Sequence, residues 1–248
     1  MRRYPSPYAS SFSFGPGPIS TALKALIGAN VAMFFATAFV PSLTRWLGLS
    51  PLAVLTQLRL WQLITYMFLH GGVFHIVFNM LALWMFGAEL ERMWGTRYFL
   101  KFYFVTGAGA GVITVLVAVL PFAFSQQVMY SLTIGASGAI YGLLLAYAMY
   151  FPDRPIYMYF VFAIPAKYFV LIMGAISFFS SVSGTGGGLA HATHLGGLLV
   201  AYLFLKSARI HPMAEVKYRY MKWKINRVRK KFDVYSGGRA DDYDRRVH

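Results

Sequence analysis

Apolar runs long enough to cross a membrane recur along most of this chain and constrain its fold more than any other feature. A helix needs about 20 residues to span the hydrocarbon of a bilayer, and turn signals separate about six such runs. We predict spans at 19–40, 66–88, 98–120, 133–151, 166–183 and 187–205. Since 58% of the 248 residues are hydrophobic and 12% are charged, a soluble domain would lack the polar surface to cover itself. The sequence therefore predicts an all-α, multi-pass integral membrane protein built as a six-helix bundle.

Positive charges indicate which side of the membrane each connection faces, because cytoplasmic connections are enriched in Lys and Arg. Arg2, Arg3 and Lys24 lie before or at the start of the first span, and other basic residues lie between spans two and three and between spans four and five. The connections on the other side carry only Arg45 and Arg59. We therefore expect both termini to be cytoplasmic, with the protein in the inner membrane of a bacterial cell.

Two segments lie outside the predicted membrane domain, which occupies residues 19–205. Residues 1–18 are rich in Pro, Ser, Gly and aromatic residues and are expected to form a flexible cytoplasmic segment. Residues 206–248 carry 13 of the 23 Lys and Arg residues and account for most of the net charge of +15. Because this tail follows a membrane span, we expect it to contact anionic lipid headgroups rather than nucleic acid. The sequence leaves the oligomeric state open.

A serine near the start of the fourth span is the first candidate for chemistry. Ser137 follows an uncharged outer connection, so it should lie near the N-terminus of its helix and close to the outer side. Unpaired backbone N–H groups and the positive end of the helix dipole can stabilise an oxyanion there. The position suits a nucleophile, although a lone serine in a membrane helix more often bonds to its own backbone or bridges two helices.

Small residues predict that the fourth and sixth spans approach each other closely. They recur every four positions, as Gly138, Gly142 and Ala146 in the fourth span and as Thr193, Gly197 and Ala201 in the sixth. This packing would bring the Oγ of Ser137 within hydrogen-bond reach of His194. Tyr141, one turn further along, either packs on the imidazole ring or fills the core.

The second span carries another polar pair. His75 and Asn79 are four residues apart, so they share a helix face and can direct two hydrogen-bond donors at one spot. An oxyanion site is the favoured interpretation of this pair, and bonding between helices is the alternative for Asn79. We expect His70 to cap the outer end of this span and His191 to pack or hydrogen-bond beside His194.

Metal and cofactor motifs are missing from the sequence. It contains no His-Glu-x-x-His, and His191-x-x-His194 has no neighbouring carboxylate, so we expect neither a metal nor a cofactor. The glycines at 107–111 lie in an apolar span without a preceding strand, and helix packing explains them better than a dinucleotide loop. Without cysteine, disulfides and thiolate chemistry are excluded.

Three motifs lie on three different spans: Gly135-Ala136-Ser137-Gly138 on the fourth, His194-Leu195-Gly196-Gly197 on the sixth, and His70 with His75-Ile76-Val77-Phe78-Asn79 on the second. A further pattern at the inner end of the second span consists of Gly87, Glu91 and Gly95. Over roughly residues 61–201, the chain resembles the rhomboid family of intramembrane serine proteases. The resemblance implies a rhomboid-like bundle in which Ser137 is the nucleophile and His194 the general base. It also implies an oxyanion hole made by His75, Asn79 and the Ser137 N–H, with Tyr141 and Gly138 in supporting positions.

The first loop departs from the family pattern. The family often has Trp-Arg at a position where this chain has Trp61-Gln62. A neutral amide thus replaces a fixed positive charge, which leaves the structural role of the loop in question. Arg59, two residues earlier, is a candidate to compensate.

The chemistry implied is hydrolysis of a peptide bond in or beside the transmembrane helix of a membrane-protein substrate. A dyad is the simplest form, because no carboxylate is apparent to orient His194. The fifth span and the glycines at 184–188 are expected to move as a substrate gate. One alternative is a non-catalytic rhomboid-like protein that binds transmembrane helices, although retention of both Ser137 and His194 argues against it. The other alternative is a small-solute transporter. The sequence argues against it, because it shows no clear inverted repeat and no midplane carboxylate.

Overall fold

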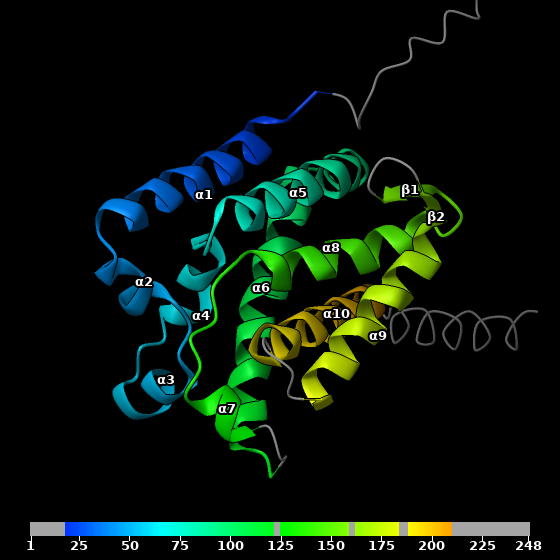
Figure 1. The fold of residues 1–248 in the computed structure, drawn as a ribbon. Helices are drawn as coiled ribbons and strands as arrows, with labels where there is room; N and C mark the ends of the chain where they lie inside the picture. The colour runs from blue at the N-terminus through cyan, green and yellow to red at the C-terminus, as the bar shows by residue number, and fades with distance from the viewer. Residues whose placement is uncertain (1–17, 122–124, 159–161, 184–187, 210–248) are drawn as a thin grey trace, which may run out of the picture. The chain divides into compact units, whose positions relative to one another are not determined.

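The structure, a computed structural model, describes residues 18–121, 125–158, 162–183 and 188–209. Its six longest helices are α1 (Thr21–Phe39), α5 (Val73–Trp94), α6 (Thr96–Val119), α8 (Ser137–Tyr150), α9 (Ala166–Ser183) and α10 (Gly188–Arg209) (Figure 1). They are joined by α2 (Ser42–Leu47), α3 (Pro51–Gln57), α4 (Gln62–Thr65), the 3₁₀ helix η1 (Tyr66–Phe68), α7 (Ser125–Met129) and the strands β1 (Pro155–Met158) and β2 (Phe162–Pro165). The contacts divide the chain into two compact units, Met1–Leu205 and Lys206–His248, and the contacts described below lie in the first.

Each of the six predicted spans overlaps one of the long helices. Within the described residues, α1, α5 and α6 are long and apolar enough to cross a membrane, while α8 and most of α9 are shorter apolar helices. The predicted all-α membrane bundle therefore agrees with the structure, with one addition. The addition is the antiparallel pair of strands β1 and β2, in which Ile156 pairs with Ile164.

Two spans begin later than the sequence predicts. The second is expected from residue 66, but α5 starts at Val73 after the separate short helices α4 and η1. The fourth is expected from residue 133, but α8 starts at Ser137 because Thr133 pairs with Leu49 through backbone hydrogen bonds of 2.9 and 2.8 Å. Apolar composition does not distinguish the segments before α5 and α8 from the long helices themselves, since all of them contain buried apolar residues.

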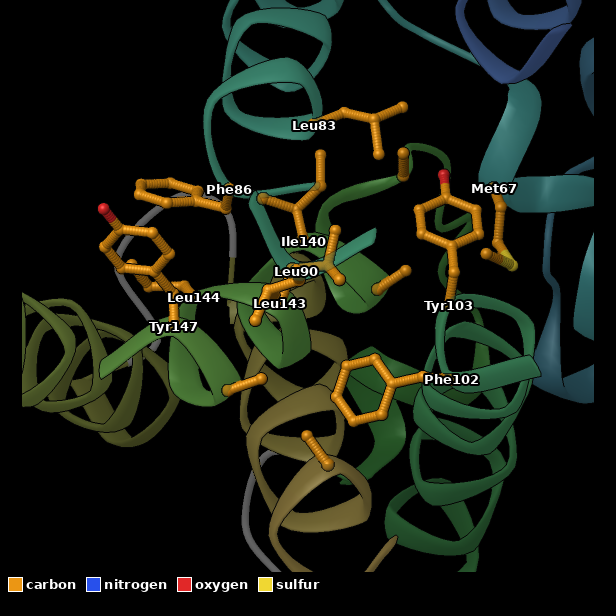
Figure 2. Packing of buried hydrophobic residues seen from close by; sticks show 14 of the residues in the cluster. Met67, Leu83, Phe86, Leu90, Phe102, Tyr103, Ile140, Leu143, Leu144 and Tyr147 are labelled. Atoms are coloured by element: carbon orange, nitrogen blue, oxygen red, sulfur yellow. The ribbon is translucent and has the colours of Figure 1, made fainter. Parts of the chain in front are cut away.

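Buried side chains from α5, α6 and α8 meet in the core (Figure 2). Leu83, Leu90, Phe102, Tyr103 and Leu143 are all fully buried there. The helix α8 is apolar around its whole circumference, which is typical of a helix enclosed by its neighbours. Its central position brings the first residue of α8 next to α5 and α10, where the candidate site lies.

Polar contacts join the helices at the opposite end of α5. Glu91 is buried, and its two carboxylate oxygens accept hydrogen bonds from Ser20 at 2.5 Å and from Thr96 at 2.6 Å. Gly95 has a positive φ of 79°, a conformation that favours glycine. The Glu91 pattern noted in the sequence therefore links the start of α1 to the junction of α5 and α6.

Candidate active site

Ser137 is the first residue of α8, whereas the sequence predicts only that it lies near the start of its span. The backbone turns into this helix at Gly135, whose φ of +121° favours glycine, and the Gly135 N–H donates to the Tyr66 carbonyl at 2.9 Å. A Cβ at Gly135 would also lie 2.7 Å from Nε2 of His75. Glycine is therefore required here both by the backbone angle and by the approach of the histidine, and Ser137 is left at a helix end with free N–H groups.

The Oγ of Ser137 lies 2.8 Å from Nε2 of His194 on α10, so the predicted contact is present. It depends on the small residues where α8 and α10 cross. A Cβ at Gly197 would lie 2.0 Å from the Gly138 carbonyl oxygen, and one at Gly142 would lie 3.2 Å from the Ala201 Cβ. The two predicted small-residue faces therefore do pack against each other, and their close packing brings the serine and histidine together.

Tyr141 stacks on the imidazole of His194, with ring centroids 4.1 Å apart and planes inclined by only 7°. The sequence allows Tyr141 either to pack on the imidazole ring or to fill the core, and in the structure it packs on the ring. The Tyr141 hydroxyl accepts a 3.3 Å hydrogen bond from Ser177 on α9, which restricts the tyrosine in turn. Nδ1 of His194 is buried and makes no hydrogen bond to the described residues, so no carboxylate orients the ring in this part of the chain.

A hydrogen bond between α6 and α10 lies directly beside His194. Thr193 is 1% exposed, and its Oγ1 is 2.7 Å from Oγ1 of Thr114. Because the Thr114 hydroxyl donates its single hydrogen to the Ala110 carbonyl at 2.9 Å, Thr193 must be the donor in this pair. The bond opposes rotation of α10 about its axis. Sequence reasoning did not single out Thr114, and the only available signal was a hydroxyl in a strongly apolar span.

His75 directs one ring nitrogen toward the Ser137 loop. Its Nδ1 accepts a 3.3 Å hydrogen bond from the Gly71 N–H, so a neutral ring carries its hydrogen on Nε2, the atom that faces Gly135. Asn79 is buried, and its amide donates to the His75 carbonyl at 2.7 Å. One of the two amide hydrogens of Asn79 is therefore used within its own helix, and the second remains available.

The prediction that His70 caps the second span is wrong. The cap of α5 is Gly72, which has no side-chain hydrogen bond, and His70 instead lies buried with its ring 4.9 Å from that of His75. The Gly71-Gly72 pair explains the difference, because it separates His70 from the first turn of the helix. His191 packs edge-on against His194 with ring centroids 5.7 Å apart, in line with the packing role predicted for it.

Gln62 has a clear structural role in the first loop. Its side chain is fully buried, accepts a hydrogen bond from the Ser50 N–H at 3.1 Å and donates to the Trp46 carbonyl at 3.2 Å. The neutral amide therefore joins α2, α3 and α4 without any charge. The Arg59 guanidinium is 4.6 Å from the centre of the Trp46 ring, so the positive charge in this loop lies on its surface.

The glycines at 107–111 pack between helices. A Cβ at Gly107 would lie 2.2 Å from Met67, and one at Gly109 would lie 2.7 Å from Val200 on α10. This agrees with the packing interpretation of the sequence. No group of three or more His, Cys, Asp or Glu side chains suited to a metal ion occurs in the described part of the chain.

These features define a helical integral membrane protein with a serine and a histidine in contact at one helix end. A Rhomboid domain model matches residues 57–208, more than half of the chain, and the chain therefore belongs to the rhomboid family. The predicted family and the predicted fold class of a helical membrane bundle are thus confirmed.

Individual relatives are similar over part of this chain. "Rhomboid protein 1, mitochondrial" of Saccharomyces cerevisiae is 29% identical over 140 residues, which cover 55% of this chain and 38% of the yeast protein. "Rhomboid protease GluP" of Bacillus subtilis is 31% identical over 149 residues, 59% of this chain and 26% of that protein. "RHOMBOID-like protein 12, mitochondrial" of Arabidopsis thaliana is 29% identical over 151 residues, 58% and 45% of the two chains. The chain spans less than half the length of each of these relatives.

Proposed function

We propose that this protein is an intramembrane serine endopeptidase that hydrolyses peptide bonds in or beside the transmembrane segments of other membrane proteins. The observation that carries the proposal is the 2.8 Å contact between Ser137 Oγ and His194 Nε2. Membership of the rhomboid family supports it, and the similar GluP of Bacillus subtilis is named a rhomboid protease.

The first chemical step is attack of Ser137 on the carbonyl carbon of the substrate. Nε2 of neutral His194 accepts the hydroxyl proton, which requires that the ring hydrogen be on Nδ1. Stacking on Tyr141 restricts the ring to an orientation in which Nε2 faces Ser137. The proton then passes to the leaving amine, an acyl-enzyme forms on Ser137, and water releases it with the same histidine as base.

Negative charge on the substrate oxygen is stabilised by an oxyanion hole made of His75 Nε2–H, the remaining amide hydrogen of Asn79 and the Ser137 N–H. Two observations support this role. The Gly71 N–H directs the ring hydrogen of His75 to Nε2, and Ser137 opens α8, where the helix dipole is positive. Donors that are already oriented stabilise the charge without further reorganisation.

Transmembrane protein segments are the proposed substrates. The peptide bonds of a helix are shielded by their own hydrogen bonds, so the cleaved segment should contain helix-weakening residues such as glycine. Entry through a movable α9 is part of the proposal, because α9 contacts the site through Ser177 and Tyr141. The glycines at 184–188, also expected to belong to the gate, lie largely outside the described residues.

The setting of the enzyme is also proposed. We assign residues 19–205 to the membrane domain, and 1–18 and 206–248 to cytoplasmic segments. We further propose the inner membrane of a bacterial cell and contact of the basic tail with anionic lipids. The basis is the distribution of Lys and Arg, since Arg45 and Arg59 are the only such residues in the connections on the Ser137 side.

Cleavage by purified protein tests the proposed function. The full chain is placed in lipid vesicles with a panel of single-span peptides, and the fragment masses are compared for wild type, Ser137→Ala and Ser131→Ala. Ser131 is a suitable control, because it is a buried serine whose hydroxyl donates to the nearby Val128 carbonyl at 2.7 Å. Fragments should appear with wild type and Ser131→Ala and disappear with Ser137→Ala. Identical fragments from all three proteins would point to a contaminant and end the proposal.

The Thr114–Thr193 bond is expected to position His194 for catalysis. Thr114→Val keeps the shape of the side chain but removes the hydrogen bond, and interhelical bonds in membranes contribute about 0.6–1.7 kcal/mol. We expect kcat to fall about three- to tenfold with little change in KM. Thr114→Ser restores the hydroxyl and should restore kcat. A purely structural role would instead lower the thermal stability of Thr114→Val without changing kcat per folded molecule.

A further inference from the structure

Two arginines of the first loop line one cavity. The cavity has a volume of about 410 Å³ and is lined by Ser42, Leu43, Arg45, Trp46 and Arg59. Arg45 lies in the last turn of α2, and Arg59 lies in the turn between α3 and α4. These short helices lie at the end of the membrane unit away from β1 and β2 (Figure 1). Two positive charges are thus brought together over one hollow.

No carboxylate of the described residues balances these charges. The chain has no Asp or Glu before Glu89. Glu89 pairs with Arg154, and Asp153 pairs with Lys167 at 2.6 Å. Glu89 lies in α5 roughly 24 Å along the helix axis from Val73, the end of α5 nearest the Ser137 loop. Any anion that neutralises Arg45 and Arg59 must therefore come from outside the described residues.

The surface around the cavity is apolar. Leu58 is 71% exposed, Leu60 is 58% exposed and Trp46, which underlies the Arg59 guanidinium, is 51% exposed. Tryptophan is enriched where hydrocarbon meets headgroups in a membrane. A ligand that fits both the hollow and its surroundings therefore combines an anionic group with apolar chains.

We propose that this cavity binds the phosphate of an anionic phospholipid from the leaflet on the Ser137 side. The guanidinium groups of Arg45 and Arg59 donate hydrogen bonds to the phosphate oxygens, because the planar fork of arginine matches phosphate geometry. The Ser42 hydroxyl supplies a further donor, and the acyl chains lie along Leu58 and Leu60. The site is separate from the dyad and does not depend on the proposed protease activity.

This lipid would hold a loop that is joined to the Ser137 segment. Leu49, between α2 and α3, pairs with Thr133 by two backbone hydrogen bonds, and Gly135 bonds to Tyr66. Gln62 joins the same loop from the inside. The lipid would thus fix the outer surface of a loop whose inner surface supports the start of α8.

Photo-crosslinking in vesicles tests the proposal. The full chain is incubated with phosphatidylglycerol or phosphatidylcholine, each with a diazirine at the same acyl carbon near the glycerol, and adducts are mapped to residues 42–61. We expect phosphatidylglycerol to label this segment, and the double variant Arg45→Gln/Arg59→Gln to lower that labelling by at least about fivefold. The variant Lys24→Gln/Arg97→Gln removes two exposed charges elsewhere and should label like wild type.

Three results would overturn the proposal: unchanged labelling of the double arginine variant, equal labelling by phosphatidylcholine, or displacement of phosphatidylglycerol by excess inorganic phosphate. The last would show that the hollow takes free phosphate rather than lipid. Folding of each variant is checked by circular dichroism and gel filtration. Arg45→Gln alone, at an exposed position, should still lower labelling about threefold and serves as the second variant.

Discussion

Replacing His194 by alanine is expected to lower kcat for peptide cleavage by about 1,000-fold, with KM changed far less. Without Nε2 at 2.8 Å, the Ser137 hydroxyl has no base to accept its proton. The serine would remain in place, because it lies at the start of α8, and so substrate binding should survive. The measurement is the rate of cleavage of a single-span peptide in vesicles at several substrate concentrations.

His191→Ala is the matched control for this prediction. His191 lies on the same helix and touches the His194 ring edge-on, but no contact with Ser137 is found for it in the described structure. We therefore expect this variant to keep most of the wild-type kcat. If His194→Ala were as active as His191→Ala, the general-base assignment would be wrong, even if Ser137→Ala were inactive.

Gly197→Ala is expected to abolish measurable cleavage and to destabilise the protein by about 1–3 kcal/mol or more. The added Cβ would lie 2.0 Å from the Gly138 carbonyl oxygen and 2.9 Å from its carbon. Both atoms belong to the backbone and cannot rotate away, so α8 and α10 must separate by roughly 1 Å. A shift of that size breaks the Ser137–His194 hydrogen bond, because donors and acceptors interact only over a narrow range of distance.

Gly28→Ala provides the comparison, since it makes the same substitution on α1, where the new Cβ has no described atom within 4 Å apart from the nearby backbone of its own helix and its chain neighbours. It should leave cleavage unchanged and slightly favour the helix. Thermal unfolding in detergent and peptide cleavage are measured for both variants. Normal activity of Gly197→Ala would contradict the prediction, because it would mean that the dyad keeps working when α8 and α10 are further apart.

Much of the fold follows from local sequence. Each long apolar run became a helix, and the fifth began at Ala166 as predicted, immediately after Pro165. The partnership of α8 and α10 was also predictable, because small residues recur every four positions on both. Periodicity and helix length are properties of neighbouring residues, so they can be recognised in a single sequence.

The details of the site required contacts between distant segments. Apolar composition placed the starts of spans two and four too early, because it contains no information on the pairing of Leu49 with Thr133. In the sequence, Gln62 was notable only because it replaces the arginine of the family pattern. In the structure, its amide holds the first loop together through hydrogen bonds to Ser50 and Trp46. Thr114 gave no local signal for its bond to Thr193, 79 residues further along the chain.

The sequence alone determined that this chain crosses a membrane as helices and that Ser137 and His194 lie on helices able to pack closely. Only the tertiary structure decided which nitrogen of His75 faces the serine, that Tyr141 stacks on His194, and that Arg45 and Arg59 share a cavity. The physical reason is that helix formation and hydropathy depend on adjacent residues. Hydrogen-bond partners, ring stacking and shared cavities depend instead on which distant side chains the packed helices bring within a few ångströms of each other.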